Sequence, residues 1–230
     1  MTNNVLCSIS TRGRYDSTLP LTLQSVATQT VPPDHLVIFD DNDDPIDLRE
    51  NQMYYYLFQM LDERGIKWAV VFGERKGQHY NHQKANQMGH KWVWRLDDDT
   101  VANPDTLEIL LSHTADDVGA VGGAILTPPI KTKKIEATGL IDNISSEPNI
   151  QWGYIDEVKE VDHLHCSFLY RAGIMDYNLG LSPRAFREET LFTYGLRVKG
   201  YRVLVVPTVT WHLQNAKGGI RTNIAEYKNL

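Results

Sequence analysis

Short hydrophobic runs alternate along the first half of the chain with longer segments that carry polar residues on one side. The short runs are nearly continuous in apolar residues, which is typical of strands buried on both faces of a sheet. The strands are predicted at 5–10, 36–39, 67–72, 92–96 and 118–121. The intervening helices are predicted at 20–29, 48–64, 80–88 and 104–113. Glycine and proline residues at the ends of several segments support these boundaries.

A strand followed by a helix, repeated four times, predicts an α/β fold whose mostly parallel sheet has helices on both faces. In such a sheet, ligands bind beyond the carboxyl ends of the strands. Three polar clusters, at 10–14, 40–44 and 97–99, directly follow predicted strands. We therefore expect the three clusters to meet in one place and to form the functional site.

The pattern changes after about residue 125. Residues 127–129 read Thr-Pro-Pro, and residues 131–149 are polar and irregular. Residues 150–171 look rich in strands, and a helix at 187–199 and a strand at 201–206 follow. The last residues, 214–230, are polar and are expected to form a tail or a lid. We expect a single domain over 1–230, with a first half at 1–125 and a second half at 126–213.

Composition narrows the class of protein. The chain has 230 residues, and 29 acidic residues against 23 lysines and arginines give it a net charge of −6. This acidic balance argues against broad nucleic-acid affinity, which needs many positive side chains to neutralise phosphates. Cys7 and Cys166 are expected to be buried thiols rather than a disulfide or a zinc site. Neither a leader nor an integral membrane segment is apparent, so a cytoplasmic location is expected.

The sharpest chemical feature is the acidic triplet Asp97-Asp98-Asp99. Three adjacent carboxylates repel one another, and a divalent cation at the end of a buried strand would offset that repulsion. Mg²⁺ and Mn²⁺ prefer carboxylate oxygens and commonly take their remaining ligands from phosphates. The alternative is a solvated acidic turn before the helix that begins near Pro104. The position directly after the apolar strand favours the cation site.

Two other clusters carry weaker signals. One carboxylate of Asp40 or Asp41 could accept the N–H of a nucleobase, although such a run is usually a polar turn. Arg12 and Arg14 follow the first strand, where a guanidinium could bind a base or a diphosphate through two hydrogen bonds. The alternative for this segment is a basic loop that leads into a helix.

Single residues elsewhere admit two interpretations. Gly77 precedes a predicted helix whose N-terminus would favour an anion, and Lys84 could face a phosphate or simply be exposed. Glu188 and Glu189 could do chemistry or could only favour the positive end of the helix that they begin. Viewed alone, His212 beside Trp211 is more typical of a packed surface histidine.

Together, these elements resemble the family 2 glycosyltransferases, which have a GT-A fold and use nucleotide-sugar donors. The resemblance runs from Val5 to His212 and depends on the order and spacing of short motifs. The matching motifs are Thr11 with Arg14, Asp40-Asp41, Gly77 with Lys84-Ala85-Asn86, Asp97-Asp98-Asp99 with Pro104, Glu188-Glu189, Gly200-Tyr201-Arg202 and His212. Two positions depart from the family pattern, because Glu189 stands where an Asp is usual and Ser10 stands where a Pro is frequent.

The resemblance implies a Rossmann-like sheet that binds the nucleotide sugar in residues 1–125, with a smaller strand-containing acceptor and catalytic region in 126–213. It implies that Thr11, with Asp40 or Asp41, holds the base, and that Asp98 contacts the ribose or the metal. Asp99 would bind Mn²⁺ or Mg²⁺, with His212 on the metal or the diphosphate. The remaining donor-binding candidates are Arg12, Arg14, Gly77, Lys84, Asn86 and Asp97. Glu189, or its neighbour Glu188, would be the catalytic carboxylate.

The function that follows is a metal-dependent inverting glycosyltransferase, in which a carboxylate removes the proton of the acceptor hydroxyl. A UDP-sugar is the favoured donor. Two alternatives are a sugar nucleotidyltransferase and a non-catalytic protein that binds nucleotide sugars or carbohydrates. The segment Ser10–Arg14 is short and poor in glycine for a nucleotidyltransferase loop. A binding protein would bind the donor without turnover and would be indifferent to a change at Glu189.

Overall fold

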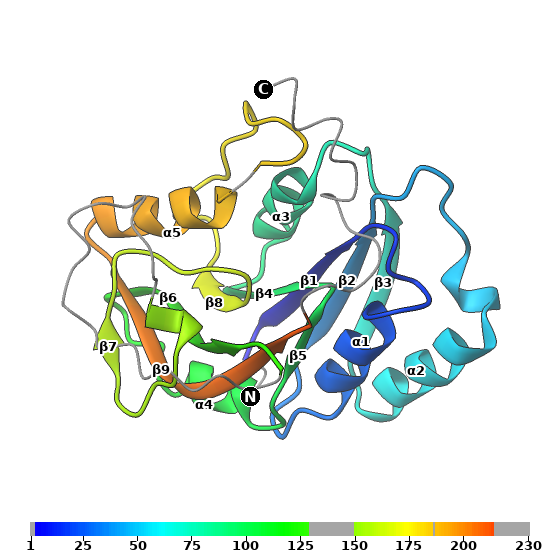
Figure 1. Ribbon diagram of the computed structural model, residues 1–230, viewed down its shortest axis with the longest axis horizontal. Coiled ribbons are helices and arrows are strands. Elements are labelled where there is room, and N and C mark those ends of the chain that lie inside the picture. The colour runs from blue at the N-terminus through cyan, green and yellow to red at the C-terminus, as the bar shows by residue number, and fades with distance from the viewer. Residues whose placement is uncertain (1–2, 129–149, 186, 214–230) are drawn as a thin grey trace.

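The computed structural model describes residues 3–128, 150–185 and 187–213. They form a mixed sheet with helices on both of its faces (Figure 1). The strands are β1 (Val5–Thr11), β2 (His35–Asp40), β3 (Lys67–Phe72), β4 (Trp92–Asp97), β5 (Thr100–Ala102), β6 (Val118–Leu126), β7 (Lys159–Glu160), β8 (Phe168–Arg171) and β9 (Arg202–His212). The α-helices are α1 (Leu19–Ala27), α2 (Gln52–Glu63), α3 (Gln78–Asn86), α4 (Thr106–Leu111) and α5 (Glu188–Val198). Short 3₁₀ turns occur at η1 (Leu48–Glu50) and η2 (Ile150–Trp152).

The strand order is β3-β2-β1-β4-β8-β6-β9-β5, with β7 paired to β9. The first four strands in this order are mutually parallel. Strand β8 then runs antiparallel between β4 and β6, and β9 is parallel to β6. Four parallel strands therefore set their carboxyl ends at one edge, while β8 joins them to the second part of the sheet.

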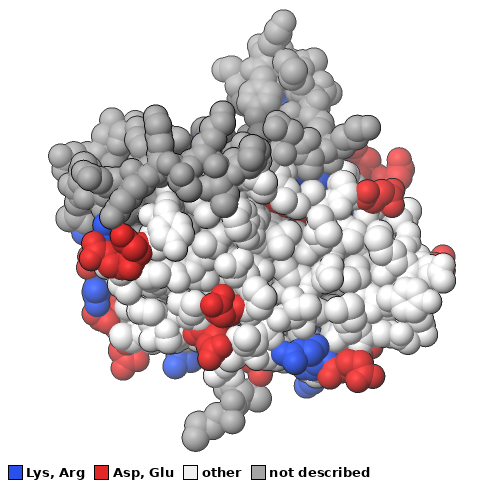
Figure 2. Space-filling model, turned by 60° about the horizontal axis from the view of Figure 1, so that its bottom comes forward, with Lys and Arg blue, Asp and Glu red and all other residues white. Residues whose placement is uncertain are grey.

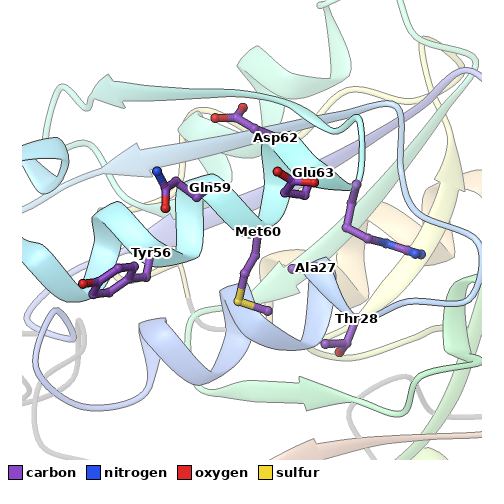
Figure 3. A pocket seen from close by; sticks show the side chains of 8 residues that line it. Ala27, Thr28, Tyr56, Gln59, Met60, Asp62 and Glu63 are labelled. Carbon is purple, nitrogen blue, oxygen red and sulfur yellow. The ribbon is translucent and has the colours of Figure 1, made fainter.

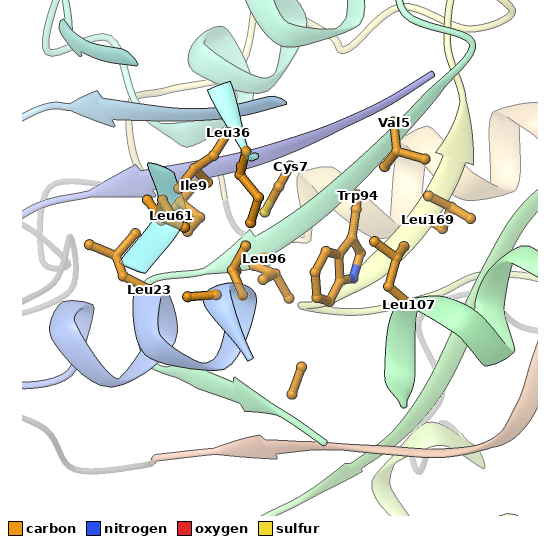
Figure 4. Close-up of a cluster of buried hydrophobic side chains, with 14 of the residues drawn as sticks. Val5, Cys7, Ile9, Leu23, Leu36, Leu61, Trp94, Leu96, Leu107 and Leu169 are labelled. Atoms are coloured by element: carbon orange, nitrogen blue, oxygen red, sulfur yellow. The ribbon is translucent and has the colours of Figure 1, made fainter. Parts of the chain in front are cut away.

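Alternation along β1 divides the apolar residues between two cores. Val5, Cys7 and Ile9 face the core that packs beneath α1, α2 and α4, shown around Trp94 in Figure 4. Leu6 faces the opposite core, which includes Ala85 of α3 and Phe192 of α5. Because successive strand side chains point to opposite faces, a run of continuous apolar residues requires both faces to be covered. The α/β fold with helices on both faces is thus confirmed.

The predicted elements of the first half are close to those observed, and the main differences lie in pairing between distant segments. The strand predicted at 118–121 continues to Leu126, and the one predicted at 201–206 runs to His212. Strand β5, directly after the acidic triplet, was not predicted. The sheet is also less parallel than expected, because β5, β7 and β8 are antiparallel to their partners.

The prediction of a strand-rich segment at 150–171 is wrong for most of its length. Only β7 and β8 are strands there, and residues 161–167 lie between them without regular structure. The alternation of apolar and polar residues at 160–164 has another cause: Val161 and Leu164 are buried together with polar Asp162 and His163. The predicted tail or lid at 214–230 lies outside the described residues.

The charged surface visible in Figure 2 has no continuous basic area: lysine and arginine side chains are scattered among acidic ones. Among the described helices, none has both the length and the apolar character needed to cross a membrane. The cytoplasmic location stays a prediction.

Candidate active site

The three polar clusters predicted from the sequence lie together at the carboxyl ends of the parallel strands. The register of the sheet explains this, because Thr11 of β1 pairs with Asp40 of β2, and Ser10 pairs with Asp97 of β4. Neighbouring parallel strands therefore end at the same level. The loops beyond these ends contact one another directly, as in the 2.7 Å ion pair between Arg12 and Asp43.

Asp98 is held from the end of β1. One of its oxygens, Oδ2, accepts a hydrogen bond of 2.8 Å from the Thr11 hydroxyl and one of 3.2 Å from the Arg12 backbone N–H. Asp98 is buried. Burial, together with the negative charge of Asp99, raises the pKa of Asp98 to about 7. The chain therefore places a carboxyl group here at a substantial electrostatic cost.

Asp99 lies between two cationic or potentially cationic side chains. Its Oδ2 is 3.2 Å from an Arg14 guanidinium nitrogen, and its Oδ1 is 3.5 Å from Nε2 of His212. The β5–β9 pairing positions the histidine, because Thr100 is paired with His212 in the antiparallel register. The Leu213 backbone N–H also donates to the Asp99 carbonyl oxygen at 2.8 Å. Strand β9 thus places its final residue, His212, beside the acidic triplet.

These side chains fit a divalent cation that takes part of its coordination from a substrate. Among the described residues, no cluster of three or more acidic, histidine or cysteine side chains is arranged to hold a metal alone. Asp99 and His212 nevertheless bring a carboxylate oxygen and an imidazole nitrogen within 3.5 Å of each other. Mg²⁺ commonly binds through one or two carboxylates plus substrate phosphates, so two protein ligands match that chemistry.

Asp40 and Asp41 are both buried, and their carboxylate oxygens accept hydrogen bonds from other residues of the chain. Asp40 accepts hydrogen bonds from the Tyr15 hydroxyl and from the backbone and side chain of Asn42. Asp41 accepts from the backbone N–H of Arg75 at 2.8 Å and of Gly77 at 3.2 Å. Asp41 therefore anchors the loop between β3 and α3 to the end of β2. Contact between either residue and a base stays a prediction.

Gly77 is required by a close backbone contact. It has a φ of +98°, and a side-chain Cβ there would lie 2.2 Å from the Pro183 carbonyl oxygen. Lys84 forms an ion pair of 2.7 Å with Glu74, and Asn86 binds the backbone of Gly173 and Met175. None of the described contacts brings Lys84 or Asn86 to the acidic triplet. Contact between either residue and the donor stays a prediction.

Glu188 is tied to the strand that carries the triplet. Its two oxygens accept hydrogen bonds of 2.7 Å each from the guanidinium of Arg95 in β4. Both side chains are fully buried, and Gln78 donates a third hydrogen bond of 2.7 Å to Glu188. Burial raises the pKa of Glu188, and the Arg95 charge opposes that shift. Glu188 therefore ties the start of α5 to β4 through Arg95.

Glu189 faces a different environment from its neighbour. Its Oε1 is 3.4 Å from Nδ1 of His165. Burial acts to raise the pKa of Glu189, but the hydrogen bond with His165 and the charge of Arg95 together lower it to about 2. The charge of Glu189 in turn contributes to a raised pKa at Asp97, after the larger effect of burial. The first turn of α5 thus lies within electrostatic reach of the triplet.

A row of rings connects the two sides of this site. The indole of Trp152 contacts the ring of His212 at 5.6 Å and that of His165 at 6.2 Å between centroids. Nε2 of His165 and Nδ1 of His212 are buried and have no hydrogen-bond partner among the described residues. Trp152 therefore spans the space between the histidine beside Asp99 and the histidine beside Glu189.

From the sequence, neither Arg95 nor His165 was predicted to be a site residue. The signal for Arg95 was present, because a single arginine inside the apolar strand 92–96 needs a buried acidic partner. The partner is 93 residues away, so no local pattern identifies it. Cys7 and Cys166 are both free and buried, as predicted.

A surface hollow lies away from the predicted site residues. Figure 3 shows it between the end of α1 and α2, and none of the predicted site residues line it. Its lining residues are Ala27, Thr28, Tyr56, Gln59, Met60, Asp62, Glu63 and Arg64. The hollow and the acidic triplet are therefore separate features of the molecule.

Comparison with known proteins gives both a family and a fold. A family model described as glycosyl transferase family 2 matches residues 9–177. A crystal structure of GalNAc-T7 with UDP, GalNAc and Mn²⁺ is similar, with a TM-score of 0.67 and 16% identity over 97% of this chain and 45% of that chain. No curated protein sequence matches significantly.

Two structures of S. aureus TarS are also similar, each with a TM-score of 0.60 over 93% of this chain. The identities are 13% and 15%, and the matches cover 37% of one TarS chain and 60% of the shorter one, TarS 1–349. This chain therefore spans less than two thirds of each of these three structures. At such identities the likeness concerns the fold, and it confirms the predicted GT-A architecture.

Proposed function

Because the chain belongs to glycosyl transferase family 2, we propose that it is a metal-dependent inverting glycosyltransferase. It would move a sugar from a nucleoside diphosphate to an acceptor hydroxyl. The observation that carries this proposal is the grouping of Asp98, Asp99 and His212 at the strand ends, directly after Asp97, which lies within electrostatic reach of Glu189. Such a grouping could hold a cation against a departing diphosphate, and Glu189 could receive the proton of the acceptor hydroxyl.

The donor side is built from residues that are already fixed before substrate binds. Thr11 and the Arg12 backbone hold Asp98 in place, and Arg14 does the same for Asp99. Preorganised charges require little reorganisation when charge develops on the leaving group. Arg12, with a third of its side chain exposed, is available to contact a diphosphate. A UDP-sugar is the donor that the family resemblance favours.

Asp99 and His212 would hold the cation, with Asp98 beside them. When bound, Mn²⁺ or Mg²⁺ supplies positive charge against the diphosphate as the bond to the sugar breaks. The protein's own part is to keep these ligands close together, and the β5–β9 pairing does so through backbone hydrogen bonds.

Glu189 is the carboxylate proposed to take the proton of the acceptor hydroxyl. Its lowered pKa keeps it ionised at neutral pH, which is the form that a base requires. Glu188 cannot serve equally well, because Arg95 and Gln78 bind both of its oxygens. A single displacement, with the base opposite the leaving group, inverts the configuration of the sugar carbon.

The test is a turnover screen with UDP-, GDP- and dTDP-sugars in the presence of Mn²⁺, with and without a chelator. We expect turnover of one donor class, with loss of activity when the chelator is added. Asp99→Ala should abolish turnover, and Glu189→Gln should lower kcat by about 10²–10⁴-fold while donor binding, measured calorimetrically, is retained. Asp116→Ala is the matched control, because Asp116 is fully exposed and its ion pair of 3.9 Å is with Arg171, which is not a predicted site residue.

Three outcomes would contradict the proposal. Donor binding without turnover would favour the non-catalytic binding protein, and release of inorganic diphosphate from a sugar phosphate and a nucleoside triphosphate would favour the nucleotidyltransferase. Turnover that survives both Asp99→Ala and Glu189→Gln would overturn the roles given to those residues.

A further inference from the structure

A buried arginine connects the two halves of the proposed site. We propose that Arg95 is a positioning residue, which fixes the distance between the acidic triplet and Glu189 by binding Glu188. This inference rests on the proposed function, because it assigns a role within that reaction. Neither the family match nor the structural likenesses assign any role to this arginine.

The geometry of the pair is that of a rigid connection. Arg95 donates from Nη1 to one oxygen of Glu188 and from Nη2 to the other, at 2.7 Å each. Two parallel hydrogen bonds fix orientation as well as distance, which a single contact does not. Neither side chain is exposed to solvent. Exchange of these bonds with water is therefore suppressed.

The connection has a functional residue next to each end. On the strand, Arg95 is two residues before Asp97 and contacts it at 3.4 Å, and Asp98 and Asp99 follow directly. On the helix, Glu188 is covalently adjacent to Glu189. A shift of the first turn of α5 relative to β4 would therefore move the proposed base relative to the donor side. Errors of about 1 Å in such placement can cost about 10²-fold in rate.

Other contacts hold the arginine itself. The guanidinium carbon lies 5.5 Å from the centre of the Phe168 ring and 6.0 Å from that of Tyr177. Phe168 is the cross-strand neighbour of Arg95 in β8. The flat guanidinium is thus held among aromatic rings, and its orientation toward Glu188 is set before any substrate binds.

A purely stabilising role is the weaker explanation. Removing two charges from water is costly, and well-packed apolar residues in place of a buried ion pair are often neutral or stabilising. A chain under pressure for stability alone has no need of charges at this place. A requirement for direction and distance between β4 and α5 accounts for them.

The experiment replaces both members of the pair, so that neither Arg95 nor Glu188 is left as an unpaired buried charge. The variant is Arg95→Met with Glu188→Met. Its matched control is Arg197→Met with Asp162→Met, which removes an ion pair of 2.8 Å from the last turn of the same helix. Thermal unfolding, kcat, the KM for the donor and amide hydrogen exchange of residues 188–191 are measured for each protein.

We expect the first double variant to unfold within a few degrees of the wild type but to lose about 10²-fold in kcat, with the donor KM changed by less than about threefold. Its amides at 188–191 should exchange about tenfold faster, because the start of α5 is no longer tied to β4. The control should keep wild-type kcat and wild-type exchange at these positions. Arg95→Lys keeps the positive charge but cannot donate the two parallel hydrogen bonds of a guanidinium. Its kcat should fall between those of the wild type and the double variant.

Wild-type kcat together with unchanged exchange at 188–191 in the double variant would overturn the inference. If that variant fails to fold, Arg95→Lys decides, because unchanged kcat there has the same meaning. Failure of the proposed function gives a different result: the wild type itself turns over no donor. In that case hydrogen exchange still decides whether Arg95 anchors the start of α5.

Discussion

At the scale of single residues, the site separates its carboxyl groups by environment. Asp98 and Glu189 are both buried. Asp98 has a pKa raised to about 7, since burial and the adjacent Asp99 disfavour its charge. Glu189 has a pKa lowered to about 2, since His165 and Arg95 outweigh its burial. Groups whose pKa values are driven apart in this way commonly mark functional sites.

The raised pKa of Asp98 predicts how stability depends on pH. The folded chain binds this proton more tightly than the unfolded chain, so the free energy of unfolding falls as pH rises from about 4 to about 7. Asp98→Asn removes that loss, which amounts to at most about 4 kcal/mol for a shift of three pKa units. In EDTA, the variant should therefore gain stability over the wild type between pH 5 and pH 8.

Urea unfolding at the two pH values measures this difference. Asp116→Asn provides the control, because Asp116 is exposed and its substitution should leave the wild-type pH dependence intact. An Asp98→Asn variant whose stability relative to the wild type is the same at pH 5 and pH 8 would rule out the buried, repelled carboxyl group.

His165 predicts a second pH effect, this time on activity. His165→Phe removes the hydrogen bond that helps to lower the pKa of Glu189, so that pKa should rise. A base is active only when deprotonated, and activity should then be lost at a higher pH than in the wild type. The acid limb of kcat against pH measures the shift. His113→Phe, two residues after the end of α4, should leave that limb in place. An unmoved limb in His165→Phe would exclude the coupling.

Local patterns were sufficient for part of this site and insufficient for the rest. Asp97–Asp99 could be found from the sequence because the triplet directly follows an apolar strand. Adjacent carboxylates at the end of a buried strand repel one another unless a cation offsets the repulsion. The pairing of Arg95 with Glu188 could not, since it joins residues separated by 93 positions. The distinct environments of Glu188 and Glu189 likewise depend on which face of α5 meets β4, and periodicity did not choose between them.

At the scale of elements, the loop before α3 depends on one glycine. Gly77→Ala should destabilise the protein by more than about 2 kcal/mol, because the added Cβ meets the Pro183 backbone and the positive φ is also strained. Gly89→Ala is the matched control: its φ is +80°, but a Cβ there has no neighbour within 4 Å. It should cost about 1 kcal/mol from backbone strain alone.

Urea denaturation of the two variants separates contact from strain. Equal losses of stability in Gly77→Ala and Gly89→Ala would mean that the backbone at Pro183 moves aside at no cost in free energy. From the sequence, Gly77 was expected to precede a helix N-terminus that favours an anion. What approaches it in the structure is another part of the chain, and a glycine carries no side chain from which its neighbour could be inferred.

Most helix and strand positions in the first half followed from hydrophobic patterning because elements such as β1, β2, β4 and α2 bury apolar residues. Helix α3 is an exception, since the residues that it buries are mostly polar. Strand β5 could not be found in that way. It has only three residues, and its stability comes from pairing with β9 rather than from its own sequence. The prediction of a strand at 160–164 was wrong because alternation of apolar and polar residues is not specific to strands. Here apolar and polar side chains are buried together in a segment without regular structure.

At the scale of the whole molecule, the two predicted halves are interleaved in one sheet. Strand β8, from the second half, lies between β4 and β6 of the first half. Residues 1–128 alone would therefore leave β4 and β6 without their common neighbour and expose apolar surface in both cores. We expect this fragment to lack cooperative unfolding and native-like protection from proteases, while the full chain unfolds in one transition.

Circular dichroism and limited proteolysis test this expectation, with the full chain as the reference. A fragment 1–128 that melts cooperatively would show that the first half is an independent domain. The α/β class was predictable because it depends on repeated local units. The place of β8 was not, because an antiparallel insertion depends on which distant segment completes the sheet.

The position of β8 also has a consequence for biosynthesis. A nascent chain emerges from the ribosome in order, so β6 is available long before the strand that must sit beside it. Until residues 168–171 have left the exit tunnel, the edges of β4 and β6 are unsatisfied, and such edges can pair wrongly or recruit another chain. Synthesis of this protein should therefore depend on chaperones that shield the emerging polypeptide during this interval.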